Sequence, residues 1–302
     1  MQKNNSFDML ILGGSYAGLS AALALGRSLR QVLILDSGTP CNRQTPHSHN
    51  FLTQDGETPA AIAQKARTQV LQYPTIQFHS GTASWGKKTA EGFEIGTEAG
   101  ETFSTQKLIV ATGIRDLLPP IPGFADCWGI SVIHCPYCHG YEFRNCPTAI
   151  MANGERAFHL ASLVRNLTDT LTIFTSGRSE FSPEQRARLS AHGIEIIETP
   201  LSEIVHQNGS IRKVIFEDGR EQALEAMYAA VPFEQSSPIP EMMGCELTDS
   251  GHLKTDLFQK TTVTGIFACG DGASMMRSVA NAVATGSMAG AMTHKELIDA
   301  HF

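Results

Sequence analysis

Two cysteines separated by two residues, Cys135 and Cys138, are the residues of this sequence best suited to chemistry. They lie in the stretch HCPYCHGYE, residues 134–142, and His139 directly follows the second cysteine. A Cys-x-x-Cys pair at the start of a helix can bring its sulfur atoms within disulfide range and can lower the pKa of one thiol. The stretch therefore predicts a redox-active dithiol.

Three other uses of the pair compete with this interpretation. Cys-x-x-Cys-His is also the attachment sequence for c-type haem, but that chemistry belongs to exported proteins and we find no export signal in the sequence. Zinc could use the pair together with Cys127, Cys146 and His139, although the spacing is not that of a common zinc site. The last alternative is two buried structural cysteines. We favour the redox pair and expect no metal.

The other cysteines and the overall charge indicate the setting of this chemistry. Seven scattered cysteines favour a reducing, cytoplasmic compartment, and we expect Cys41, Cys245 and Cys269 to be buried and inert. With 23 basic and 30 acidic residues the net charge is -7, and no Lys/Arg block occurs, so neither nucleic acid nor a membrane is an expected partner. No apolar run is long enough for a transmembrane helix.

A glycine-rich turn near the N-terminus predicts a dinucleotide-binding unit. The apolar run 8–12 leads into GGSYAG, residues 13–18, then into an Ala/Leu-rich helix to about Ser28 and a second apolar strand that ends at Asp36. Gly13 suits the tight turn and Gly18 the close packing of helix on strand, whereas Ser15 stands where a second glycine is usual. Asp36 is placed to accept hydrogen bonds from a ribose.

A second, weaker unit of the same kind follows the Pro-rich linker 119–123. It comprises a strand at 148–151, the turn Ala152-Asn153-Gly154 with Ala157, a helix to about Asn166 and a strand at 171–174. Two further apolar strands end in small residues, at 108–113 and at 265–271. The pattern predicts an α/β protein with two Rossmann-like domains of three-layer architecture.

These motifs, in this order and spacing, resemble those of the low-molecular-weight thioredoxin reductases, FAD-dependent members of the pyridine nucleotide-disulfide oxidoreductases. The resemblance covers nearly the whole chain. It implies a discontinuous FAD domain, residues 1–117 plus 245–302, and a central NAD(P)-binding-like domain, residues 118–244, that carries the dithiol. It also implies a homodimer and a Cys138 that faces the flavin.

The resemblance assigns cofactor contacts by position. In the first unit, the residues expected to hold the FAD diphosphate and ribose are Gly13, Gly14, Ser15, Ala17, Gly18 and Asp36. At the two later strand ends and the start of the last helix, those expected to hold FAD are Thr112, Gly113, Gly270, Asp271, Arg277 and Ser278. The positive N-terminus of that helix would favour the anionic reduced flavin.

The sequence also departs from the family pattern. The central turn lacks the full set of glycines, and Thr175-Ser176-Gly177 with Arg178 replaces the His-Arg-Arg cluster that holds the 2′-phosphate of NADPH. Glu180 is the nearest acid to the position that would bind an NAD ribose, and Pro232-Phe233 replaces a glycine at another strand end. NAD(P)H is therefore a doubtful cofactor.

The acid that usually follows the second cysteine is here His139. The run Cys-x-x-Cys-His-Gly-Tyr-Glu resembles the branch of the family that includes dithiol oxidases of fungal epidithio metabolites. In that branch a dithiol reduces the flavin and dioxygen completes the cycle. A histidine suits this direction because it can take a thiol proton at neutral pH.

Three functions follow as hypotheses. The first is a dithiol oxidase in which Cys135, Cys138 and His139 are catalytic and dioxygen or another compound accepts the electrons. The second is an NAD(P)H-dependent reductase of a thioredoxin-like protein, and the third is a slow-turnover flavin redox sensor. The sequence leaves open whether His47 and His49 line the flavin or lie in a surface loop.

Overall fold

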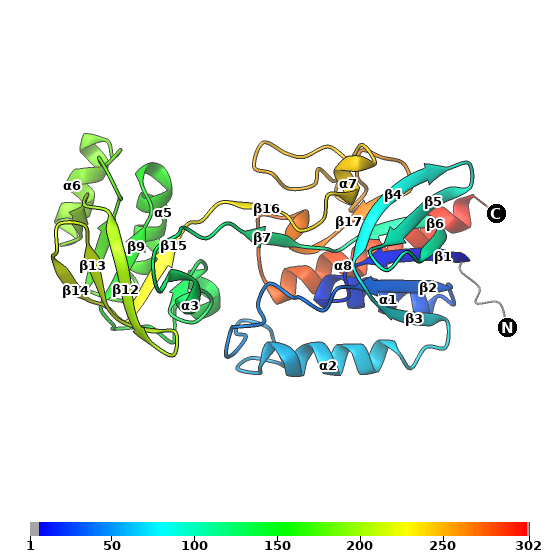
Figure 1. The fold of residues 1–302 in the computed structure, drawn as a ribbon, viewed down its shortest axis with the longest axis horizontal. Helices are drawn as coiled ribbons and strands as arrows, with labels where there is room; N and C mark the ends of the chain where they lie inside the picture. The colour runs from blue at the N-terminus through cyan, green and yellow to red at the C-terminus, as the bar shows by residue number, and fades with distance from the viewer. Residues whose placement is uncertain (1–5, 301) are drawn as a thin grey trace. The chain divides into compact units, whose positions relative to one another are not determined.

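The computed structural model describes residues 6–300 and 302, which divide into two compact units. The first unit comprises residues up to Arg43, Phe51–Arg115 and Phe233–Phe302, and the second comprises Gln44–Asn50 and Asp116–Pro232. The chain thus returns to the first unit at residue 233, earlier than the expected 245. There β16 (Phe233–Gln235) pairs with β7 (Ile114–Asp116), so the strand that returns to the first unit lies beside the strand that leaves it (Figure 1).

The first unit is built on a mainly parallel sheet, in the order β3-β2-β1-β6 with β17 on the other side of β6. An antiparallel extension, β5 and β4, pairs with the first half of β6. The strands are β1 (Ser6–Leu12), β2 (Val32–Asp36), β3 (Ile76–Ser80), β4 (Ala83–Thr89), β5 (Gly92–Thr97), β6 (Thr102–Val110) and β17 (Ile266–Ala268). The helices are α1 (Tyr16–Arg27), α2 (Pro59–Val70), α7 (Ile239–Met242) and α8 (Val279–Asp299).

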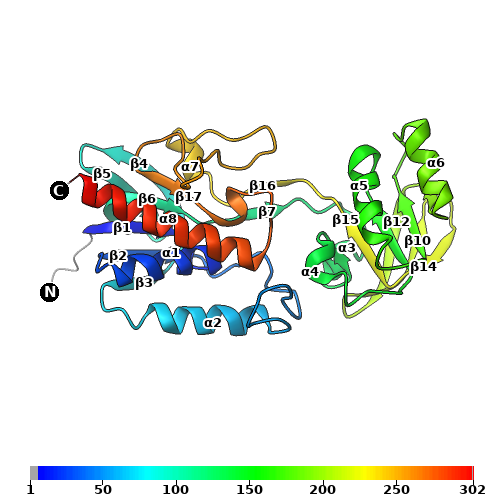
Figure 2. The same ribbon diagram turned by 180° about the vertical axis from the view of Figure 1, so that it is seen from behind.

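The central strands of this sheet are buried on both faces, as the uninterrupted apolar runs predict. Met9 and Ile11 of β1 belong to a core shared with α1 and α8, whereas Leu10 and Leu12 belong to a core on the opposite face. Helices α1 and α8 lie against each other (Figure 2). The two helices approach closely at Gly286, where a Cβ would stand only 2.1 Å from the carbonyl oxygen of Ala17. Glycine is therefore required at this position.

The second unit has a parallel sheet in the order β11-β10-β9-β15-β8. One core covers the face toward α5 and α6, and another fills the space between the sheet and an antiparallel meander, β12-β13-β14, which gives the predicted three layers. The strands are β8 (Val132–Ile133), β9 (Thr148–Met151), β10 (Leu171–Phe174), β11 (Glu195–Ile197), β12 (Leu201–Gln207), β13 (Ser210–Phe216), β14 (Glu221–Ala223) and β15 (Ala226–Ala229). The helices are α3 (Phe124–Cys127), α4 (Pro136–His139), α5 (Gly154–Val164) and α6 (Pro183–Ala191).

Candidate active site

The two cysteines of the Cys-x-x-Cys motif form a disulfide whose Cα atoms are 5.3 Å apart. Cys135 is the N-cap residue of the short helix α4, and the backbone N–H groups of Cys138 and His139 both donate to its carbonyl oxygen. The proline at the first helical position needs no hydrogen-bond partner there. This single turn holds both sulfur atoms on a partly exposed segment, where a thiol can reach them.

His139 is the C-terminal residue of the same turn and is half-buried. Burial, and then the neighbouring His49, lower the pKa of His139 below the ordinary value, while Glu142 acts in the opposite direction. The imidazole is consequently neutral at pH 7, the state in which it can accept a proton. The sequence motif contains Glu142 but does not by itself indicate a role for it.

The Cys135–Cys138 pair differs from the other cysteines. Burial raises the pKa of Cys127 to about 11 and that of Cys269 to about 12, so these thiols are inert at neutral pH, and Cys245 is also buried with a raised pKa. The expectation that Cys41 is buried is wrong, because it is exposed in the loop that follows β2. Among residues 6–300 and 302 there is no cluster of three or more His, Cys, Asp and Glu side chains that could hold a metal.

In the first unit, the glycine turn between β1 and α1 fits a phosphate-binding role. Gly13 has φ +100°, and a Cβ there would stand 2.3 Å from the carbonyl oxygen of Ala111. A Cβ at Gly18 would stand 1.8 Å from the carbonyl oxygen of Gly13, so both glycines are required. Ser15 has ordinary extended backbone angles and caps α1 without a side-chain hydrogen bond, so the missing glycine does not distort the turn.

Asp36 is placed at the end of β2 beside this turn. One carboxylate oxygen accepts from the N–H of Gly14 at 2.8 Å and the other from the N–H of Gly38 at 3.2 Å. Each oxygen has a further lone pair, so the side chain can still accept a ribose hydroxyl. The geometry agrees with the position that the fingerprint assigns to a ribose ligand.

The strand ends at residues 112–113 and 270–272 meet within the first unit. The carbonyl oxygen of Gly113 lies 3.4 Å from the Cβ position of Gly272, and a Cβ at Gly113 would meet no atom within 4 Å. The hydroxyl of Thr112 and the amide oxygen of Gln235 are buried polar atoms that lack a protein hydrogen-bond partner. Buried polar groups are normally satisfied, so these two atoms fit a site for a polar ligand such as FAD. Sequence reasoning missed Gln235.

The remaining predicted FAD contacts lie at the start of α8. Ser278 is the N-cap residue and accepts from the N–H of Asn281 at 3.1 Å, so the helix begins one residue later, at Val279. Arg277 Nε lies 3.7 Å from Asp271 Oδ2. Ala17 packs against α8 at Gly286, so the structure brings the predicted residues of both strand ends and both helices into one unit.

The central unit contains the corresponding βαβ turn, but its own side chains occupy it. The side-chain oxygen of Asn153 accepts from the N–H groups of Gly154 and Glu180, both at 2.9 Å, and its amide donates to the carbonyl oxygen of Arg178. Glu180 Oε2 lies 3.5 Å from the position that a Cβ at Gly154 would take. A carboxylate therefore stands at the helix N-terminus where a pyrophosphate would need positive potential.

Side chains of the central unit also form hydrogen bonds with the loop after β10. The side chain and N–H of Ser179 both donate to Glu198, and Arg186 donates to the carbonyl oxygen of Ser179 at 3.1 Å. The hydrogen bonds from Ser179 hold the pKa of Glu198 below its ordinary value, and Arg186 and Arg178 add to this effect. Glu198 therefore holds a negative charge beside the two arginines nearest the end of β10.

Comparison with known proteins identifies the family of the chain. Residues 7–286 match the family profile described as pyridine nucleotide-disulphide oxidoreductase. The chain is 33% identical to thioredoxin reductase tcpT of Claviceps purpurea, over 99% of this chain and 96% of the relative, and 34% identical to thioredoxin reductase sirT of Leptosphaeria maculans, over 94% and 92%. The crystal structure of the oxidoreductase from Agrobacterium tumefaciens superimposes with a TM-score of 0.91 at 39% identity, over 97% of this chain and 99% of that one.

The fold and the site thus define an FAD-dependent oxidoreductase of the pyridine nucleotide-disulphide class. Within that class, the chain belongs to the low-molecular-weight thioredoxin reductase-like family. The predicted α/β fold with two Rossmann-like sheets is confirmed. In the part of the chain that the structure describes, none of the helices has both the length and the apolar character needed to cross a membrane.

Proposed function

We propose that this flavoprotein oxidises a small dithiol and passes the electrons to dioxygen, without NAD(P)H. The observation that carries the proposal is the turn of the central unit, where Asn153 accepts from the backbone N–H groups of Gly154 and Glu180, and where Glu180 and Glu198 place carboxylates beside the turn and the loop after β10. Electrons must then enter through the cysteine pair. The low pKa of His139 supports this direction, because a neutral imidazole accepts protons from incoming thiols.

The chain's own residues account for the thiol chemistry. One substrate sulfur, deprotonated with His139 as base, attacks Cys135 Sγ, so a substrate–Cys135 bond forms and the Cys135–Cys138 bond breaks. The second substrate sulfur then attacks the first, which releases a substrate disulfide and leaves Cys135 and Cys138 reduced. The substrate has lost two electrons and two protons. Bound FAD supplies the two-electron chemistry that links the reduced cysteines to dioxygen, and hydrogen peroxide is the product.

The residues proposed to hold FAD belong to the first unit. Gly13, Gly14, Ser15, Ala17 and Gly18 form the phosphate turn. The other proposed contacts are Asp36, Thr112, Gly113, Gly270, Asp271, Arg277 and Ser278. The unsatisfied hydroxyl of Thr112 and the open space beside Gly113 support these assignments.

Anaerobic reduction of the yellow protein tests the proposal. We expect dithiothreitol, used as the probe dithiol, to bleach the flavin absorbance, and admitted air to restore it with one peroxide per substrate disulfide. NADPH and NADH should leave the absorbance unchanged over the same time. Rapid bleaching by either nucleotide would overturn the proposal.

The runner-up function is NAD(P)H-dependent reduction of a thioredoxin-like protein. The relatives named above, which are thioredoxin reductases, favour it. It requires that the Asn153 and Glu180 contacts open to admit the nucleotide. Because that route depends on nucleotide binding, the NADPH arm of the same experiment separates the two functions.

We also propose that the chain forms a homodimer, as its family resemblance implies. Light scattering coupled to size-exclusion chromatography should give twice the chain mass. A mass equal to one chain at micromolar concentration would reject the dimer.

A further inference from the structure

The segment 44–50 follows the first βαβ unit in sequence but packs with the central unit. Gln44 Nε2 and Thr45 Oγ1 each lie 3.0 Å from the position that a Cβ at Gly129 would take. Ser48 is buried, with 6% of its surface exposed. The segment is therefore fixed against the part of the chain that carries the dithiol.

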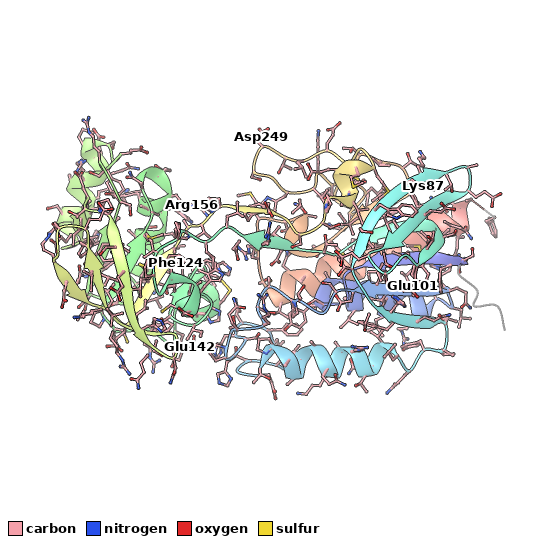
Figure 3. All side chains as sticks on the ribbon, in the orientation of Figure 1. Lys87, Glu101, Phe124, Glu142, Arg156 and Asp249 are labelled. Atoms are coloured by element: carbon pink, nitrogen blue, oxygen red, sulfur yellow. A yellow bond between two sulfur atoms is a disulfide. The ribbon has the colours of Figure 1, made fainter. Side chains whose placement is uncertain are left out.

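His49 of this segment contacts two residues of the Cys-x-x-Cys-His-Gly-Tyr-Glu run. Its Nε2 lies 3.5 Å from Glu142 Oε1, and its ring meets the ring of His139 edge-on, with centroids 6.3 Å apart and planes at 90°. Glu142 is labelled in Figure 3. The side chain of His49 is 21% exposed and that of Glu142 is 37% exposed, so solvent screens the pair only in part.

We propose that His49 is a positioning residue that pairs with Glu142 and thereby keeps the carboxylate from drawing a proton onto His139. The inference rests on the proposed function, in which His139 takes a proton from the substrate thiol. Without a partner for Glu142, the carboxylate would stabilise a protonated His139, and a protonated imidazole has no lone pair with which to accept.

The groups around His139 determine whether its pKa rises or falls when one of them is replaced. Glu142 comes from its own segment, and His49 comes from the segment 44–50, where the ring of His47 lies 6.4 Å from that of His49. From the sheet, the hydroxyl of Tyr228 approaches Gly140, and burial raises the pKa of this phenol so that it stays neutral. Beyond α5, the neighbour of Gly140 is the apolar Leu167. Of the ionisable side chains, His49 and Glu142 are the ones that bias His139.

Opposite variants test this arrangement. His49→Gln removes the partner of Glu142, so the pKa of His139 should rise. The acid limb of the pH profile of dithiol oxidation should then move to higher pH by about one unit. Glu142→Gln removes the attraction itself and should move the limb in the opposite direction. His159→Gln, at an exposed histidine of α5 in the same unit, is the matched control and should leave the limb in place.

The measurements are the pH profile of dithiothreitol oxidation and an NMR titration of the His139 ring in the oxidised holoenzyme. If the wild type does not oxidise dithiothreitol, the proposed function fails, while the NMR titration still tests the pairing. If the wild type turns over and His49→Gln moves neither the limb nor the His139 titration, the inference is overturned. It is also overturned if both variants move them in the same direction.

Discussion

At the scale of single residues, reactivity depends on where each thiol lies. Cys135 and Cys138 lie on a partly exposed turn next to a neutral histidine, whereas Cys127 and Cys269 lie in cores that raise their pKa. A thiol is a nucleophile only as a thiolate, so burial alone makes Cys127 and Cys269 unreactive at neutral pH. The sequence spacing marks the reactive pair, and the structure accounts for the inertness of Cys127 and Cys269.

The roles of the two redox cysteines can be tested by removing one sulfur. Cys138→Ser should bind FAD normally but lose dithiol turnover by at least about 100-fold, because no disulfide can form for the substrate to attack. Flavin absorbance measures the first property and peroxide release the second. Cys146→Ser is the control, since its serine can keep the weak donation to the carbonyl oxygen of Arg144. Unchanged turnover in Cys138→Ser would reject the mechanism.

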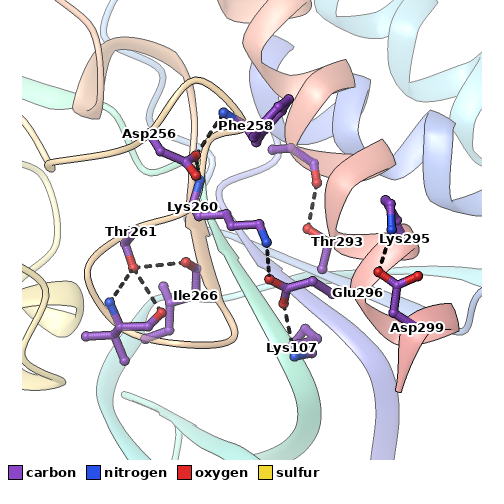
Figure 4. Close-up of polar contacts among 12 residues, drawn as sticks. Lys107, Asp256, Phe258, Lys260, Thr261, Ile266, Thr293, Lys295, Glu296 and Asp299 are labelled. Carbon is purple, nitrogen blue, oxygen red and sulfur yellow. Dashed lines mark hydrogen bonds and ion pairs between the residues drawn. The ribbon is translucent and has the colours of Figure 1, made fainter. Parts of the chain in front are cut away.

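At the scale of elements, helix α8 is fixed to the first unit by an ion-pair network (Figure 4). Glu296 of α8 pairs with Lys107 of β6 at 3.1 Å and with Lys260 of the loop before β17 at 2.7 Å. Thr261, next to Lys260, donates to the carbonyl oxygen of Ile266 at 2.9 Å and fixes that loop. Glu296 is 22% exposed, so its two partners offset a substantial loss of hydration.

Glu296→Gln should lower the free energy of unfolding by about 1 to 3 kcal/mol, measured by urea denaturation at pH 7. Asp299→Asn is the control on the same helix, because its pair with Lys295 is exposed, and it should change stability by less than about 0.5 kcal/mol. An equal loss in the two variants would show that the network adds nothing beyond a surface ion pair.

The same network gives stability a pH dependence. Burial raises the pKa of Glu296, but the hydrogen bonds from Lys260 and Lys107 outweigh it, so the pKa in the folded state lies below the ordinary value. A carboxyl with a depressed pKa contributes its stability above the unfolded-state pKa and loses it as pH falls through the folded-state value. The difference in the free energy of unfolding between wild type and Glu296→Gln should therefore disappear as the pH falls below about 4.5.

At the scale of the whole molecule, the two units have separate cores and separate dinucleotide-type turns. The turn of the first unit keeps Gly13 and Gly18, whereas the side chains of Asn153 and Glu180 lie at the turn of the second. This difference supports the proposal that the first unit binds FAD at its turn, whereas the central unit carries the dithiol and binds no nucleotide.

The effect of each ligand on the melting temperature tests which unit binds a nucleotide. FAD added to apoprotein should raise the melting temperature, because a ligand at 100 times its dissociation constant stabilises the folded state by about 2.7 kcal/mol. NADPH at millimolar concentration should leave the melting temperature of the holoprotein unchanged. Differential scanning calorimetry measures both, and a clear shift with NADPH would show that the central turn opens.

The sequence alone determined the fold class, the two βαβ units and the identity of the dithiol. These features depend on local patterns: apolar runs of strand length, glycines at turns of positive φ or close approach, and a Cys-x-x-Cys spacing that one helical turn closes. The strands at 148–151 and 171–174 were predicted at their observed bounds for this reason. Asp36 likewise lies at the end of its predicted strand.

The tertiary structure decided which distant side chains meet. His49 lies 90 positions from His139, Glu198 lies 19 from Ser179, and Gln235 lies 37 from Gly272, and no local pattern encodes such contacts. The sequence did not decide the role of His49 and did not indicate Gln235 or Glu198. The partners of these residues are distant in sequence and are set by how loops pack on the sheets. Side chains become a site only when folding places their charges and donors within a few ångströms, and that placement is a property of the packed chain.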